Sequence, residues 1–286
     1  MYPAPFSYVR VATVADALAA LAEHPGGRFL AGGHSLLPAM KLRLAEPATL
    51  IDIGRVAELQ GIARQGGTLR IGSLATHDQV ASSDIICAGA RLLAEACAKV
   101  GDAAVRNWGT LGGNLAHADP ASDPPPALVA AGARLELQSS VGQRWVAAGE
   151  FFSDLFITAL ASDEIITAVE VPAAGARTGS AYLKHPHPAS GYAVCGAAAV
   201  VELDADGRCA SARLAIGGVG PVPVTIDDVS ALSGEPLQQA AVDAALAGID
   251  VAEPLSDPYA SADYRLRLAR VLGRRALLLA ASRATG

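Results

Sequence analysis

Two short stretches, Ala31-Gly32-Gly33-His34-Ser35 and Thr110-Leu111-Gly112-Gly113-Asn114, carry the most informative pattern in this sequence. In each, a pair of glycines is followed by polar side chains. Glycine lacks Cβ, so its backbone can adopt positive φ and approach a ligand closely, and consecutive N–H groups can converge on a phosphate oxygen. Ser35 and Asn114 add side-chain donors. Together, the two stretches predict a diphosphate held between two modules of the chain.

Other nucleotide-binding and catalytic templates are not matched. Neither stretch follows G-x-G-x-x-G or G-x-x-x-x-G-K-[ST], which disfavours Rossmann and Walker-type sites. The sequence also contains no G-x-S-x-G and no H-E-x-x-H, so a hydrolase or metalloprotease reading is poorly supported. The loop from Asp119 to Asp123 offers carboxylates, which would repel a diphosphate and therefore suit ribose hydroxyls or an adenine amine. An Asx-capped turn is the alternative for this loop.

Around the first stretch, the sequence predicts a small β–α–β subdomain over residues 1–55. A capping-box-like start at Thr13 with Asp16 opens a helix, which ends at His24-Pro25-Gly26-Gly27. Short strands are predicted at Arg28–Leu30 and Thr49–Ile53.

Around the second stretch, residues 56–175 are predicted to form another α+β subdomain. A long helix is expected from about Ser83 to Val100, and a polar, proline-rich loop from Asp119 to Pro126. Strands are expected on both sides of a Gly66-Gly67 turn and further along the chain, at Gly61–Arg64, Thr68–Ile71, Leu128–Leu137 and Glu164–Val171.

The small, aperiodic residues from Ala173 to Gly179 are the best domain boundary, and residues 176–286 are predicted to form a C-terminal domain. Strands are expected at Ala193–Leu203 and Cys209–Gly217. Two helices are expected near Leu237–Gly248 and Ser261–Ser282, where apolar residues recur at helical spacing. The fold class is therefore α+β in three modules.

Composition narrows the class of protein. The 286 residues include 22 Lys+Arg and 28 Asp+Glu, a net charge of −6, which argues against nucleic acid as a partner. The N-terminus has no signal-peptide pattern, and no apolar run approaches the ~20 residues that span a bilayer. We therefore expect a soluble, cytoplasmic protein. The four cysteines form no C-x-x-C pair and are predicted to be reduced core thiols rather than metal or iron–sulfur ligands.

The glycine stretches, together with the downstream Asp-Pro-x-x-Asp loop, resemble the FAD-binding medium subunit of molybdenum hydroxylases, including the flavoprotein subunit of aerobic carbon monoxide dehydrogenase and of xanthine dehydrogenase. The resemblance covers essentially the whole chain. It extends to Pro5–Tyr8, to Leu36–Leu44 and to the segment from Tyr264 to Ala276.

The resemblance implies a fold similar to the vanillyl-alcohol-oxidase type of flavoprotein: two α+β subdomains that hold an extended FAD, and a C-terminal α+β domain of the carbon monoxide dehydrogenase flavoprotein type. It implies that the pyrophosphate is held by both stretches, at Ala31, Gly32, Gly33, His34, Ser35, Thr110, Gly112, Gly113 and Asn114. It places Asp123 at the ribose or adenine end. Gly72, Thr76 and His77 would pass near the cofactor, and Lys184 and Tyr192 would lie near the isoalloxazine ring.

One departure from the family pattern lies close to this ring. Many relatives carry an Arg a few residues after the lysine and an Asp just before the aromatic residue, whereas this chain has His187 and Gly191. Any role of that Arg–Asp pair, such as tuning the flavin, is therefore not expected here.

The function implied by the resemblance is electron relay. FAD in this chain would accept electrons from the 2Fe-2S clusters of a small partner subunit, after substrate is hydroxylated at a large molybdopterin subunit, and pass them to an external acceptor. A dimer of such heterotrimers is the expected assembly. Two alternatives stay open: a self-contained small flavin oxidase or dehydrogenase, and a nucleotide-binding module without redox activity.

Overall fold

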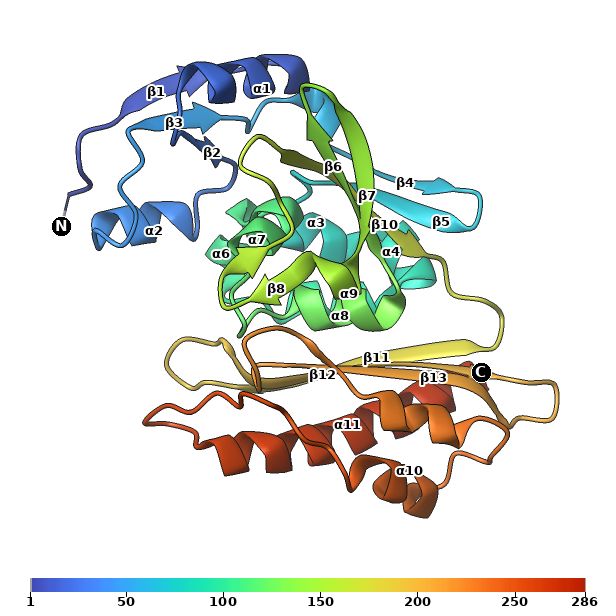
Figure 1. The fold of residues 1–286 in the computed structure, drawn as a ribbon. Helices are drawn as coiled ribbons and strands as arrows, with labels where there is room; N and C mark the ends of the chain where they lie inside the picture. Colours follow the sequence, from blue (N-terminus) through green and yellow to red (C-terminus); the bar gives the residue numbers. More distant parts are fainter. Residues whose placement is uncertain (1, 286) are drawn as a thin grey trace.

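The computed structural model describes residues 2–285, which form three main β-sheets with helices between and around them (Figure 1). The N-terminal sheet is parallel, with β3 (Thr49–Asp52) between β1 (Ser7–Arg10) and β2 (Arg28–Leu30). Helix α1 (Val14–Glu23) begins where the Thr13 hydroxyl accepts a hydrogen bond from the backbone N–H of Asp16. The predicted helix and both predicted strands are confirmed, while β1 is a third strand that the sequence pattern did not reveal.

The middle sheet is antiparallel. Its order is β4 (Ile62–Gln65), β5 (Thr68–Gly72), β10 (Ile165–Pro172), β6 (Arg134–Ser139) and β7 (Gly142–Ala147). The central strand β10 reaches this sheet last in sequence, and all its residues except the final proline are buried. Its apolar side chains share one core with residues of the neighbouring strands and of the helices beneath, including Ile71, Leu93, Leu111, Leu135 and Val169.

The prediction of one long helix from Ser83 to Val100 is wrong, because the helix is interrupted. The segment forms two helices, α4 (Asp84–Gly89) and α5 (Arg91–Ala98), separated at Ala90 with φ −146° and ψ 51°. Gly89 precedes the break and packs so closely that an added Cβ would lie 2.9 Å from the Leu69 side chain. A glycine with a low helix propensity and a tight contact therefore marks the point where the helix changes direction.

The predicted strand from Leu128 to Leu137 and the predicted loop from Asp119 to Pro126 are both partly wrong. Residues 124–131 form helix α8 (Pro124–Ala131), and only the end of the predicted strand becomes β6. Proline is well suited to the first turn of a helix, and Gly132 ends α8 in the left-handed region with φ +66°. A short apolar run without a clear period does not distinguish a strand from a buried helix, which is why the sequence pattern favoured a strand here.

The C-terminal sheet has the order β11 (Thr178–Pro186), β12 (Ala193–Leu203), β13 (Cys209–Gly217) and β14 (Val224–Thr225). It lies between α5 and α8 on one face and α11 (Ala262–Ala284) on the other, with α10 (Gln239–Leu246) beside α11 (Figure 1). Alternate residues of β12 serve the two faces: Ala198 and Val200 join one core, and Ala197 and Ala199 join the other. The predicted strands β12 and β13 and both helices are confirmed.

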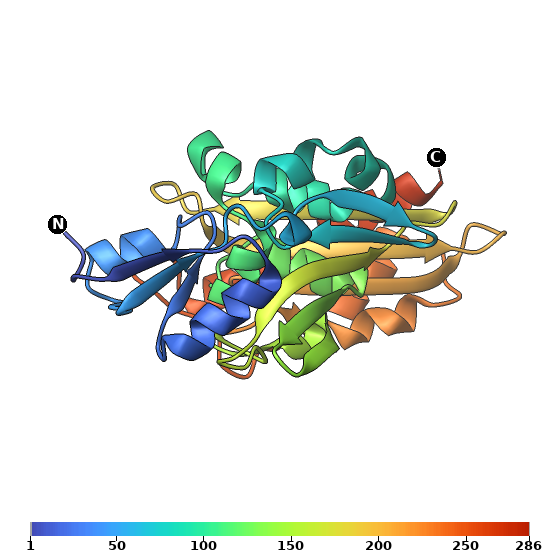
Figure 2. The same cartoon turned by 90° about the horizontal axis from the view of Figure 1, so that it is seen from above.

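Seen from above, the N-terminal sheet lies at one end of the molecule and the C-terminus at the other (Figure 2). Three of the four cysteines are buried as predicted, but Cys87 is exposed because it lies on the outer side of the short helix α4; all four thiols are free. Among the described residues, no helix is both long enough and apolar enough to cross a bilayer.

Candidate functional site

Three segments predicted to contribute to the site lie side by side in the structure. An added Cβ on Gly32 would lie 1.8 Å from the carbonyl oxygen of Trp108, so the first glycine turn touches the chain just before the second. The segment 73–77 runs along the second stretch, with backbone hydrogen bonds from His77 N to Gly109 O (3.0 Å) and from Gly112 N to Ser73 O (2.8 Å). Residues far apart in the sequence are thus assembled into one surface.

The first glycine stretch is a turn that leads into α2 (Leu36–Lys41). Gly33 has φ +72°, a conformation that glycine adopts at little cost. Within residues 2–285, the backbone N–H groups of Gly32, Gly33, His34 and Ser35 donate no hydrogen bond, whereas the carbonyl of Gly33 accepts one from Leu37 N. Consecutive N–H groups without a partner in the chain are what an anion-binding turn provides.

The second glycine stretch is different, because its backbone N–H groups have partners within the chain; that Gly112 and Gly113 hold the pyrophosphate stays a prediction. Residues 111–117 form helix α7 (Leu111–His117), so Gly112 and Gly113 lie in its first turn rather than in a loop. Their N–H groups are already bonded, to Ser73 O at 2.8 Å and to the Thr110 hydroxyl at 3.2 Å. An added Cβ on Gly112 would lie 2.5 Å from the Ser73 Cβ. These glycines therefore allow close packing instead of supplying donors.

The polar group that the second stretch does offer is the Asn114 side chain. Its Oδ1 accepts a hydrogen bond of 2.8 Å from the hydroxyl of Ser122, while within the described residues its Nδ2 donates none. Asn114 is partly exposed and Ser122 is buried. Ser122 was not singled out in the sequence, although it lies in the polar loop that was.

The segment that carries Gly72, Thr76 and His77 is closely packed and begins a helix, and its predicted place near the cofactor stays a prediction. Gly72 is buried, and an added Cβ there would lie 2.4 Å from the Leu59 carbonyl oxygen. Thr76 caps α3 (His77–Ser82) through a capping box with Gln79. Burial, reinforced by the nearby Arg106 charge, lowers the pKa of His77 to about 4, so its ring is neutral at neutral pH. The Nδ1 atom of His77 has no partner among residues 2–285.

Asp123 and Lys184, which the sequence analysis placed at opposite ends of the cofactor, form a buried ion pair. Lys184 Nζ lies 2.7 Å from Asp123 Oδ2, and the two side chains are 3% and 4% exposed. The Tyr182 hydroxyl donates to the other carboxylate oxygen at 2.7 Å. Burial raises the pKa of Asp123, although Lys184 and the Tyr182 hydrogen bond oppose the rise. Because the two side chains are in contact, they cannot lie at opposite ends of an extended cofactor, and the placement of Asp123 at the ribose or adenine end stays a prediction.

Tyr182 is a residue that sequence reasoning missed. Tyr182 and Lys184 are two residues apart on β11, so their side chains point to the same face of the C-terminal sheet. This face meets α8, where Asp123 immediately precedes the first helical residue. The period-two spacing was thus a usable signal once Lys184 was selected.

Tyr192 follows the turn after β11 and is 47% exposed. The N–H of the next residue, Ala193, donates to Ala121 O at 3.0 Å, so Tyr192 lies beside the loop that carries Asp123. Partial burial, together with the charges of Asp119 and Asp123, raises the pKa of Tyr192. His187 lies in this turn, where its Nδ1 accepts hydrogen bonds from the N–H groups of Ala189 and Ser190. Gly191 has φ +73°. The two departures from the family pattern therefore shape a tight turn beside Tyr192.

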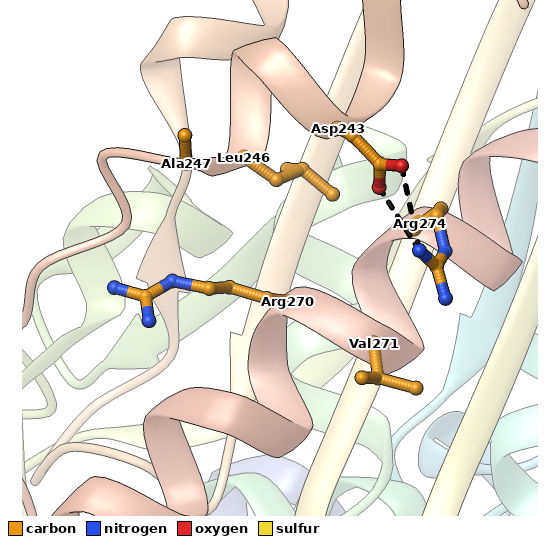
Figure 3. A pocket seen from close by; sticks show the side chains of 6 residues that line it. All are labelled: Asp243, Leu246, Ala247, Arg270, Val271 and Arg274. Atoms are coloured by element: carbon orange, nitrogen blue, oxygen red, sulfur yellow. Dashed lines mark hydrogen bonds and ion pairs between the residues drawn. The ribbon is translucent and has the colours of Figure 1, made fainter. Parts of the chain in front are cut away.

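Two hollows on the C-terminal part of the molecule contain none of the predicted site residues. One, of about 120 Å³, lies between α10 and α11, where Arg274 pairs with Asp243 across the gap (Figure 3). The other, of about 610 Å³, lies between α10 and the turn Asp227–Leu232, and includes Asp228 and Glu235. Within residues 2–285, no group of three or more His, Cys, Asp or Glu is placed to hold a metal ion.

Comparison with known proteins extends over the whole chain. The family described as "FAD binding domain in molybdopterin dehydrogenase" matches residues 4–174, and the family described as "CO dehydrogenase flavoprotein C-terminal domain" matches residues 180–280. The carbon monoxide dehydrogenase medium chain of Hydrogenophaga pseudoflava is 38% identical over 280 residues, which is 97% of each chain. The corresponding chain of Afipia carboxidovorans is 35% identical and covers 99% of each.

Solved structures agree with this relationship. Carbon monoxide dehydrogenase from Hydrogenophaga pseudoflava matches with a TM-score of 0.95 and covers 99% of both chains at 38% identity. Quinoline 2-oxidoreductase from Pseudomonas putida 86 matches with a TM-score of 0.93 and covers all of both chains at 32% identity. The α+β fold class is thereby confirmed, and the chain belongs to the family of FAD-binding medium subunits of molybdenum hydroxylases.

Proposed function

We propose that this chain is the FAD-carrying electron-transfer subunit of a heteromeric molybdenum hydroxylase. Its partners would be a small 2Fe-2S subunit, from which electrons arrive, and a large molybdopterin subunit, at which substrate is oxidised. Electrons would leave this chain for an external acceptor. In this assembly, a dimer of heterotrimers, residues 1–55 and 56–175 would form the two FAD-binding subdomains, and residues 176–286 the C-terminal domain.

The observation that carries the proposal is the set of hydrogen-bond donors that the two glycine stretches offer to a pyrophosphate. The first turn offers the N–H groups of Gly32 to Ser35, which donate no hydrogen bond within residues 2–285, and the second offers the outward amide of Asn114. Both suit the oxygens of a pyrophosphate. The residues present therefore fit FAD, with the bound charge met by dipoles and by no lysine or arginine of these two stretches.

FAD supplies redox chemistry that no side chain of this chain offers. The part of the protein is to bind the cofactor and orient it. Tyr192, partly exposed beside the Lys184–Asp123 pair, is a suitable aromatic neighbour for the ring. The buried pair gives the segments on either side of it a fixed geometry, because Asp123 is at the start of α8 and Lys184 is on β11.

The sequence of this subunit does not specify the substrate of the complete enzyme. Subunits of enzymes named for carbon monoxide, nicotine and caffeine are all 32–38% identical to it over nearly its full length. This similarity is what we expect if the flavin subunit relays electrons and a different subunit selects the substrate.

Reconstitution tests the proposal. The purified chain loaded with FAD is given carbon monoxide, an aldehyde or a purine together with an artificial electron acceptor, first alone and then with its iron–sulfur and molybdenum subunits. We expect acceptor reduction by one of these substrates only with all three subunits. Turnover of any of them by the single chain would contradict electron relay and support a self-contained flavin enzyme.

A further inference from the structure

The side-chain amide of Asn114 is hydrogen-bonded to a neighbour through its acceptor. An asparagine amide has an acceptor, Oδ1, and two donors on Nδ2, and rotation of the amide by half a turn exchanges them. Here Oδ1 accepts from the Ser122 hydroxyl at 2.8 Å. With the acceptor turned toward Ser122, both donors of Asn114 face away from it, and within the described residues Nδ2 donates to no other group.

Ser122 is itself firmly anchored. It is only 5% exposed, and its backbone N–H donates to Asp119 O at 3.0 Å. The next residue, Asp123, forms the buried ion pair with Lys184 on β11. The hydroxyl that bonds Asn114 is therefore fixed between a tight turn on one side and an interaction with the C-terminal sheet on the other.

We propose that Ser122 is a positioning residue for the pyrophosphate of FAD, which it serves by holding the Asn114 amide with its donors outward. This inference rests on the proposed FAD site. An inverted amide would present Oδ1, an acceptor with partial negative charge, to the phosphate oxygens, and this contact is repulsive. Because the second glycine stretch has no free backbone N–H of its own at Gly112 and Gly113, the orientation of Asn114 decides what this side of the site offers.

A double-mutant cycle tests the proposal in the full-length chain. The apo forms of the wild type, Ser122→Ala, Asn114→Ala and the double variant are titrated with FAD, and flavin fluorescence gives Kd. The loss of one hydrogen bond that orients a donor predicts a Kd about 3- to 10-fold higher for Ser122→Ala. In the Asn114→Ala background, Ser122→Ala should change Kd less than about twofold, because its only route to FAD is already gone.

A structural role alone would give a different pattern. If Ser122 only packs, Ser122→Ala would raise Kd by the same factor in both backgrounds, or not at all, and either result would overturn the proposal. Ser122→Thr retains the hydroxyl and should keep Kd within about threefold of the wild type. Thermal unfolding of the four apo-proteins shows whether a change in Kd arises from loss of the fold. A wild-type chain that binds no FAD would instead refute the proposed function, a result distinguishable from an absent Ser122 effect.

Discussion

The two glycine pairs of this protein look alike in sequence and behave differently in structure. At Gly32-Gly33, the turn has a positive φ at Gly33 and leaves its N–H groups without a partner within residues 2–285. At Gly112-Gly113, the backbone is helical and the N–H groups are bonded to Ser73 and Thr110. The first pair offers donors, whereas the second lets helix α7 approach the segment 73–77.

The comparison shows that a Gly-Gly motif indicates a need for glycine but not the reason for it. Both pairs need glycine, but only the first needs it for the backbone conformation that exposes N–H groups. The second needs it because a Cβ on Gly112 would collide with Ser73. The partners that occupy the N–H groups of the second pair include Ser73, about 40 residues earlier, so local sequence could not reveal them.

The largest expected effect on FAD binding comes from Gly32→Ala, which breaks the contact between the two stretches. The new Cβ would lie 1.8 Å from the carbonyl oxygen of Trp108, and backbone at this distance has to move. We expect the first turn to be displaced from Trp108 and FAD affinity to fall by at least about 100-fold, the equivalent of roughly 3 kcal/mol. Fluorescence titration of the apo-protein measures this loss.

Gly67→Ala is the matched control for Gly32→Ala. Nothing lies within 4 Å of the position of its Cβ, and it belongs to the turn between β4 and β5. Its affinity for FAD should equal that of the wild type. Equal affinities of Gly32→Ala and Gly67→Ala would show that the first turn plays no part in binding.

The Lys184–Asp123 pair joins the loop that follows the second stretch to β11, so its loss tests how much a buried ion pair stabilises this side of the site. Removal of one partner of a buried ion pair leaves an uncompensated charge, which costs about 3–5 kcal/mol. We expect Lys184→Met to lower the free energy of unfolding by this amount in urea titrations. Adding Asp123→Asn should restore part of it, since the unpaired charge is then gone. A loss below about 1 kcal/mol in the single variant would contradict the buried pair.

His77 makes the second stretch sensitive to pH. Its folded pKa of about 4 lies below the ordinary value of 6.5, so between these values the unfolded chain binds the proton more readily. The stability that depends on neutral His77 is fully present above pH 6.5 and is lost as the pH falls toward 4. The loss is on the order of 3 kcal/mol. His77→Gln should remove this part of the pH dependence. If the free energy of unfolding, measured by urea titration between pH 4 and 7, depends on pH as strongly in the variant as in the wild type, the role of His77 is refuted.

The smallest expected effect is the difference in stability between Gly33→Ala and Gly113→Ala. An alanine at Gly33 would have to adopt the left-handed region, at a cost of about 1–2 kcal/mol. At Gly113, the Cβ would lie 2.8 Å from the Thr110 hydroxyl and disturb the helix cap, but alanine's helix propensity returns about 1 kcal/mol. Urea titration of the two apo-proteins should show a lower free energy of unfolding only for Gly33→Ala. Similar losses in both variants would contradict the difference between the two glycine pairs.

Local signals predicted much of the fold. The cap at Thr13, the turn at Gly66-Gly67 and the apolar strands β12 and β13 are readable because each is decided by neighbouring residues. The strand β1 and the break at Ala90 were missed because β1 depends on pairing with β3, and the break on packing against Leu69. Tertiary contacts overrode or supplied the local preference in both places.

The candidate site shows the same division. Both glycine stretches were found from sequence, because a Gly-Gly pair before a polar residue is a local pattern. The roles of Ser122 and Tyr182 were not found, since each depends on a partner that only the fold brings near: Asn114 in one case and Asp123 in the other. The same reason explains why Asp123 and Lys184 were assigned to opposite ends of the cofactor.

Noncovalent binding of FAD at these two stretches is tested most directly by flavin analysis of the purified full-length chain. The protein is incubated with FAD, separated from free flavin and precipitated with acid, and the flavin in the supernatant is identified by mass. We expect a single FAD per wild-type chain, all of it released by acid, and almost none retained by Gly32→Ala. Absence of flavin from the wild-type chain, flavin that stays with the precipitate, or equal retention by Gly32→Ala would contradict this site.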